Sequence, residues 1–133
     1  MGLGAAKSAW NSNQFEDAVD AAARNVNSQL RAKLGRRDIG EGDLVANAFS
    51  QKPADENNPR LRLPLPANTA DATAKALYAG ISQLAQGLYS AVRNPLAHEA
   101  PGHSSITEQG ALESLAAFSL LAGWIDRSAV HRS

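Results

Sequence analysis

Two residues whose chemistry suits a phosphodiester site lie in one short string, RNPLAH at 93–98. The arginine, Arg93, can make two parallel hydrogen bonds to a phosphate. The histidine, His98, belongs to the residue type that exchanges a proton most readily near neutral pH. Together they could hold a phosphate and move a proton. The same residues also allow a structural interpretation, in which Arg93 pairs with a carboxylate, His98 caps a helix and Pro95 marks a helix end.

Pro95 sets the expected backbone of this string. Proline has no backbone N–H and disfavours α geometry in the residue before it, and Asn followed by Pro is a common start for a helix. We therefore expect the preceding helix to break or kink at Arg93–Asn94 and a new helix to begin at Pro95. The free N–H groups at such a start would attract an anion.

Three further side chains could contact a nucleic acid. Tyr89 lies one helical turn before the string and could stack on an unpaired base, although core packing beside Tyr78 is the favoured alternative. Arg60 and Arg62 follow a basic run at 31–37, and these cations could track an RNA backbone, because phosphates dominate such affinity. For the basic run, a solvated helix end is the favoured alternative, since acidic residues follow it at once.

Neither a metal site nor a cofactor is expected. His103 lies five residues after His98, but no acidic or cysteine partner stands at ligand spacing, so an exposed loop residue is the favoured interpretation. The sequence has no cysteine, which excludes disulfides, thiolate nucleophiles and cysteine-based zinc sites.

Composition places the chain among folded, single-domain proteins. It has 133 residues, of which 44% are apolar and 20% charged, so a disordered tail is excluded. Thirteen basic and thirteen acidic residues cancel, so any contact with nucleic acid must come from a local patch. No apolar run approaches the roughly 18 residues of a membrane span, and the N-terminus does not resemble a signal peptide. We expect a soluble cytoplasmic protein.

Apolar periodicity predicts helices separated by glycine- and proline-rich breaks. The expected helices cover 13–34, a shorter stretch at 43–49, 69–93 and 107–127. The last two have wide apolar faces, which favour self-association. The expected cap residues are Asn13 and Gly35 for the first helix, Gly42 or Asp43 for the second, Asn68 or Thr69 for the third and Thr107 for the last.

The segment 51–68 holds four of the six prolines, so neither a helix nor a central strand can pass through it. Leucines alternate at 61, 63 and 65, which predicts an extended segment laid against the body. This loop is either a functional or oligomer contact or an ordered surface loop. The predicted architecture is all-α, a helical bundle of four main helices plus a short helix, with one domain at 13–133 after an extension at 1–12.

The string at 93–98 resembles the R-x(4-6)-H motif, in its RN-x-x-x-H form, of the HEPN superfamily of nucleotide-binding domains. Glu99 directly after the motif, the long helix before it and the closing helix resemble one branch, the small bacterial Ymh-type or abortive-infection-type domains. This resemblance covers roughly 13–127. It implies an all-α, HEPN-like domain that dimerises and brings two motifs into one cleft.

Many members of that superfamily are metal-independent endoribonucleases of toxin–antitoxin and anti-phage systems. The resemblance therefore implies that Arg93 holds the scissile phosphate, that His98 handles the proton of the attacking 2′-hydroxyl, and that Asn94 orients one of them. Glu99 is a candidate substrate contact. The expected partners are an RNA substrate, a second copy of the chain, and an antitoxin or regulatory protein. The alternative function is a catalytically idle module that binds a nucleotide or a partner protein through the same fold.

Overall fold

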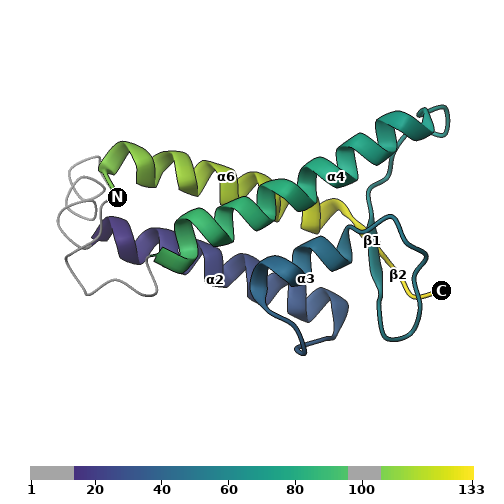
Figure 1. Ribbon diagram of the computed structural model, residues 1–133, viewed down its shortest axis with the longest axis horizontal. Coiled ribbons are helices and arrows are strands. Elements are labelled where there is room, and N and C mark those ends of the chain that lie inside the picture. Colours follow the sequence, from purple (N-terminus) through teal and green to yellow (C-terminus); the bar gives the residue numbers. More distant parts are fainter. Residues whose placement is uncertain (1–13, 96–105) are drawn as a thin grey trace.

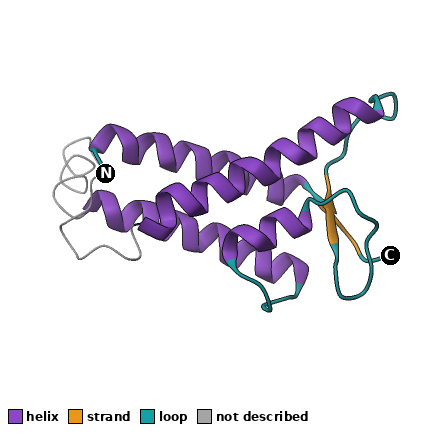
Figure 2. Cartoon of the chain, in the orientation of Figure 1, coloured by secondary structure: helices purple, strands orange, loops and turns teal. Residues whose placement is uncertain are grey.

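The computed structural model describes residues 14–95 and 106–133. Within these residues, three long helices form the body: α2 (Gln14–Leu34), α4 (Asp71–Leu88) and α6 (Glu108–Arg127). The shorter α3 (Glu41–Ala48) lies beside them, and a π-helical turn, η1 (Tyr89–Arg93), continues α4 (Figures 1 and 2). The predicted all-α helical bundle is confirmed.

The helices pack in two pairs, α2 with α6 and α3 with α4. Each presents an apolar stripe to the interior, as the three- and four-residue spacing of its apolar positions requires. Residues from α2, α3, α4 and α6 together make one hydrophobic core. The bulkiest fully buried side chains are Phe49, Phe118, Leu30, Leu34, Leu44, Leu61, Ile81, Leu121 and Ile125.

Two of the predicted caps are confirmed. Gly35 has a φ of 69°, and its N–H donates to the carbonyl of Arg31 at 2.8 Å, ending α2. A side chain would be strained in this left-handed conformation, so glycine fits the position. Thr107 precedes α6, and its hydroxyl accepts a hydrogen bond from the N–H of Gly110 at 3.0 Å. The predicted cap Asn13 lies outside the described residues.

The predicted caps of the other two helices are wrong. Gly40, rather than Gly42 or Asp43, precedes α3, and Ala70, rather than Asn68 or Thr69, precedes α4. Neither makes a side-chain cap hydrogen bond. Acidic residues occupy the first turn of both helices instead, where they interact favourably with the positive end of the helix dipole.

The predicted extended segment is confirmed in part and has a partner that the sequence did not indicate. Strand β1 (Arg60–Arg62) pairs antiparallel with β2 (Ala129–His131), and Leu61 lies opposite Val130 (Figure 2). Leu61 is fully buried, so this ribbon closes one end of the core. The N–H of Leu63 donates to the hydroxyl of Tyr78 at 2.9 Å and fastens the following residues to α4.

None of the described helices combines the length and apolar character needed to cross a membrane.

Candidate functional site

Of the break or kink predicted before Pro95, the structure shows no break but a π turn, η1, at this place. Asn94 is helical (φ −64°, ψ −46°), and its N–H donates to the carbonyl of Tyr89, five residues earlier. This wider π spacing opens the helix just ahead of Pro95, which relieves the clash between a proline ring and the carbonyl four residues before it. The chain stays helical through Pro95. No new helix therefore starts within the described residues up to Pro95. The N–H groups of the predicted anion site belong to residues after Pro95, which lie outside the described part of the chain, so that site stays a prediction.

Arg93 is held between two carboxylates from other helices. Its Nη1 lies 3.0 Å from Oδ1 of Asp20 on α2, and its Nη2 lies 3.7 Å from Oε1 of Glu41 on α3. Asp20 is shared with Arg24, whose Nε lies 2.9 Å from the other carboxylate oxygen. The Arg93 side chain is only 15% exposed. Three elements thus fix the position of one guanidinium.

The ion-pair cluster is incompletely satisfied. Among the described residues, Nε of Arg93 and Oε2 of Glu41 are buried and have no hydrogen-bond partner. Buried polar atoms are normally paired, and leaving one unpaired costs about 1–3 kcal/mol. The ion-pair cluster is therefore less stable than a fully hydrogen-bonded arrangement would be.

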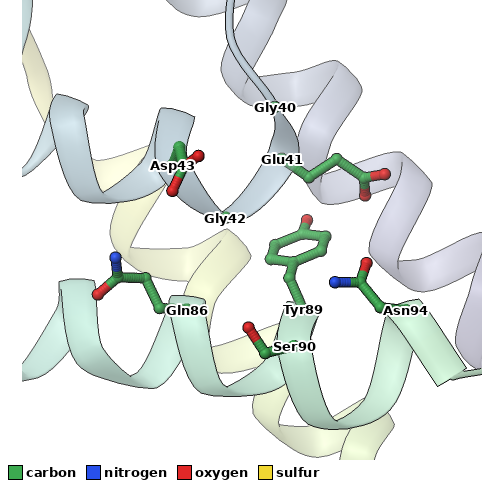
Figure 3. Close-up of a pocket in the computed structure, with 8 residues that line it drawn as sticks. All are labelled: Gly40, Glu41, Gly42, Asp43, Gln86, Tyr89, Ser90 and Asn94. Atoms are coloured by element: carbon green, nitrogen blue, oxygen red, sulfur yellow. The ribbon is translucent and has the colours of Figure 1, made fainter.

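A polar cleft of about 390 Å³ lies beside this cluster, between the first turn of α3 and the end of α4 with η1 (Figure 3). Gln86, Ser90 and Asn94 follow one another at four-residue intervals and form one wall. The first turn of α3 forms the other wall. The lining residues are Gly40, Glu41, Gly42, Asp43, Gln86, Tyr89, Ser90 and Asn94.

Gly42 allows the two walls to approach. A Cβ at this position would lie 3.4 Å from Cβ of Tyr89 and 3.7 Å from Cα of Gln86, so the α3 backbone already lies close to α4. Of the lining residues, only Tyr89 and Asn94 were predicted to have a functional role. The four-residue spacing of Gln86, Ser90 and Asn94 was a usable signal, but only the fold reveals the opposite wall.

Tyr89 belongs to the core, so the predicted base-stacking role is wrong. It is 2% exposed, its hydroxyl donates to the carbonyl of Ala23 at 2.8 Å, and its ring packs edge-on against Phe118. The alternative interpretation, that Tyr89 packs in the core, is confirmed, but its aromatic neighbour is Phe118 rather than Tyr78. Burial, and secondarily the Glu41 charge, raise the pKa of the Tyr89 phenol far above its ordinary value, so it stays protonated.

Arg60 and Arg62 both have structural roles. Arg60 is too buried to bind substrate as predicted, whereas Arg62 is half-buried and its contact with substrate stays a prediction. Arg60 is 4% exposed, and its guanidinium donates to the carbonyls of Asn47 and Lys52 at 2.7 and 3.1 Å. Arg62 donates to the carbonyl of Ser50 at 2.6 Å. The guanidinium carbon of Arg62 lies 5.1 Å from the centre of the Tyr78 ring. Burial lowers the pKa of the Arg62 guanidinium. Both arginines lie on β1, at the opposite end of the bundle from η1 (Figure 1).

The basic run at 31–37 also serves the fold. Three of its cations are half-buried and bonded within the fold, and only Arg37 is a solvated side chain as the favoured interpretation expected. Arg31 donates to the carbonyl of Ile39 at 2.6 Å. Lys33 donates to the last carbonyls of α6 at 2.6 and 3.0 Å, where a cation is favourable. Arg36 pairs with Asp38 at 2.8 Å.

The structure brings Arg93 and Asn94 to one place. His98, Glu99 and His103 lie outside the described residues. Within the residues that are described, no three histidine, cysteine, aspartate or glutamate side chains are grouped so that they could hold a metal ion.

Fold and site together define a class: an all-α bundle in which an arginine in the π turn after a core helix is held by two carboxylates, beside a polar cleft. The chain belongs to the family described as "Protein of unknown function (Hypoth_ymh)", whose sequence model matches residues 3–125. The Ymh-type part of the resemblance is thereby confirmed. No curated protein and no solved structure matches the chain.

Proposed function

We propose that this protein is a HEPN-type, metal-independent endoribonuclease that acts as a homodimer in bacterial toxin–antitoxin or anti-phage defence. The observation that carries the proposal is the setting of Arg93. Two carboxylates from separate helices aim its guanidinium at the end of a core helix, next to a polar cleft. Positioning of this kind is what catalysis by charge stabilisation needs.

Arg93 would neutralise the scissile phosphate during cleavage. Its contact with Glu41 is long, at 3.7 Å, so a phosphate could replace that carboxylate while Asp20, at 3.0 Å, keeps the guanidinium in place. A planar guanidinium can bind a carboxylate and a phosphate by separate N–H groups. Glu41 is thus the partner that substrate would displace.

His98 would handle the proton, as the resemblance implies. The 2′-oxygen attacks phosphorus as its proton passes to a histidine, and the bond to the 5′-oxygen breaks as that oxygen takes up a proton. The products are a 2′,3′-cyclic phosphate and a 5′-hydroxyl. RNA supplies its own nucleophile, so the protein provides position, charge and proton transfer. Asn94, exposed beside Arg93, would orient one of these groups.

The second candidate function is a catalytically idle module that binds a nucleotide or a partner protein. One observation favours it: Asp20 and Glu41 already offset the charge of Arg93. In an idle module the arginine would serve only to join α2, α3 and η1.

A labelled RNA oligonucleotide, incubated with the protein in excess EDTA, separates the two candidates. We expect cleavage with a cyclic phosphate on the upstream fragment, identified by mass spectrometry. His98→Ala and Arg93→Ala should each slow cleavage about 100-fold or more. Exposed His131 and Arg37 provide matched controls, since His131→Ala and Arg37→Ala should cleave like wild type.

Three results would contradict the enzyme. One is cleavage that needs added magnesium, and another is cleavage of an all-deoxy strand, which lacks the nucleophile. The third is a double variant, lacking both Arg93 and His98, that cleaves as fast as wild type. Absence of cleavage by pure, folded wild type would favour the idle module.

A further inference from the structure

The cleft between α3 and η1 presents exposed polar side chains that have no partner within the described protein. Within the described part of the chain, the side chains of Asp43, Gln86, Ser90 and Asn94 make no hydrogen bond or ion pair. They provide one carboxylate, two amides that can both donate and accept, and one hydroxyl. In Figure 3, Asp43 and Gln86 stand toward one end of the cleft, and Glu41 and Asn94 toward the other.

The charge of this lining disfavours an anion. Glu41 and Asp43 occupy the first turn of α3, and their carboxylates offset the partial positive charge of the helix start. A neutral ligand with both donors and acceptors suits the amides and the hydroxyl better than a phosphate does. At about 390 Å³, the cleft falls within the size range of sites for small ligands.

We propose that this cleft binds a nucleobase edge that carries an exocyclic amino group, with Asp43 accepting from that amino group and Gln86 and Asn94 reading neighbouring atoms. Adenine, cytosine and guanine have such a group. Uracil does not, and its carbonyl oxygens would face a carboxylate that can only accept. Since Tyr89 is buried, the base is recognised by its edge rather than by stacking on that ring.

Glu41 connects this base site to Arg93. It lines the cleft and is also the longer ion-pair partner of the guanidinium, while Asn94 adjoins Arg93 in the chain. A base in the cleft therefore lies next to the group that would hold a phosphate, as neighbouring parts of one nucleotide require. The inference that the base belongs to RNA rests on the proposed function. The inference that the cleft binds a base edge does not depend on that function.

Binding is tested by ¹⁵N NMR titration of the full chain with AMP, CMP, GMP, UMP and ribose 5-phosphate. The first three should shift the backbone signal of Gly42 and the side-chain amide signals of Gln86 and Asn94, with UMP bound about tenfold more weakly. Asp43→Asn supplies an amide that can also donate to a carbonyl, so this variant should bring UMP and CMP to near parity. Asp126→Asn, an exposed change on α6, is the matched control and should keep the preference.

Cleavage of RNA oligonucleotides that each contain one type of base tests whether the base in the cleft belongs to an RNA substrate. Asp43→Asn should increase cleavage at uridine relative to cytidine, whereas the control Asp126→Asn should leave this ratio unchanged. If wild type cleaves no RNA but the nucleotides still shift the cleft signals, the nuclease proposal fails and the base site stands, with a free nucleotide as its ligand. If RNA is cleaved but no nucleotide shifts these signals, or ribose 5-phosphate shifts them equally, the base site is overturned and the nuclease stands.

Discussion

Arg93 has unequal carboxylate partners, and this inequality has a measurable consequence. The contact with Asp20 is short and shared with Arg24, whereas the contact with Glu41 is longer and leaves Oε2 of Glu41 buried without a partner among the described residues. Removing the guanidinium would leave Glu41, which is 30% exposed, without its cation, and would leave Asp20 with Arg24 as its remaining partner. Arg93 therefore serves the fold whether or not it also serves catalysis.

We expect Arg93→Ala to lower the free energy of unfolding by about 1–3 kcal/mol, because it leaves the partly buried Glu41 unpaired and removes one of the two partners of Asp20. Glu41→Gln made in the Arg93→Ala background should destabilise less than it does in wild type. The coupling energy should be about 0.5–1 kcal/mol. Urea denaturation of the four proteins in this cycle measures it, and strictly additive losses would contradict an interaction between the two side chains. Because of this loss, activity of Arg93→Ala must be compared below its unfolding transition.

Asp38 gives the stability of the turn after α2 a dependence on pH. The hydrogen bonds from Arg36 hold the pKa of this carboxyl at about 2, below its ordinary value of 3.8. A depressed folded-state pKa contributes stability that is complete above the ordinary pKa and is lost as the pH falls through the folded value. The expected window of loss therefore runs from about pH 4 to about pH 2.

We expect an NMR titration of the Asp38 carboxyl carbon to give a midpoint near 2 in the wild type. In Arg36→Ala the midpoint should rise toward 3.8, since the main cause of the shift is removed. Arg37→Ala is the matched control, because Arg37 is exposed and adjacent and is not a cause of the shift. An unchanged midpoint in Arg36→Ala would show that another group sets the pKa.

Backbone geometry at η1 and at Gly35 sets the positions of the two walls of the cleft. The π turn of η1 keeps the helix continuous up to Pro95, so that Asn94 stays in line with Gln86 and Ser90 on the cleft wall. The left-handed Gly35 ends α2 and lets the chain turn toward α3. This change of chain direction positions the first helical turn of α3, which supplies Glu41.

Gly35→Ala should destabilise the protein by about 1 kcal/mol, because an L side chain is strained at a φ of 69°. Gly40 is the matched control. Its φ is −69° and a Cβ there would meet nothing within 4 Å, so Gly40→Ala should change the free energy of unfolding by less than about 0.5 kcal/mol. Equal losses in thermal or urea denaturation would show that α2 does not depend on this left-handed residue.

At the scale of the whole molecule, the outer surface of α6 carries an exposed apolar stripe. Leu112, Ala116 and Leu120 are exposed at four-residue intervals, with the two leucines 44% and 48% exposed. Between Glu113 and Asp126 the helix has no charged residue. An exposed apolar stripe of this kind favours association, which agrees with the proposed homodimer.

Light scattering should therefore give the mass of a dimer at micromolar concentrations. Changing both leucines, Leu112→Glu with Leu120→Glu, should shift the protein to monomer, because four charges would face one another across a twofold interface. Gln109→Glu, an exposed polar position on the same helix, should leave the dimer unchanged. A wild type that stays monomeric would contradict the dimer, and a dimeric double variant would place the interface on another surface.

The sequence by itself determined the features that depend on neighbours along the chain. Apolar spacing identified the helices, and the caps at Gly35 and Thr107 followed from residue types at helix ends. The structural interpretation of Arg93 as the partner of a carboxylate was also available from its type and setting. Such features are local, since hydrogen bonds and side-chain spacing within a few residues decide them.

Only the tertiary structure decided which distant residues meet. Asp20 and Glu41 reach Arg93 because α2 and α3 both pack near η1. Arg60 and Arg62 were predicted to face RNA, yet the carbonyl of Asn47 in α3 and that of Ser50 after α3 accept hydrogen bonds from them. The second strand and the wall of the cleft formed by α3 also arise from contacts between segments far apart in the chain. Packing of apolar faces sets these contacts, and no local spacing in the sequence encodes which face meets which.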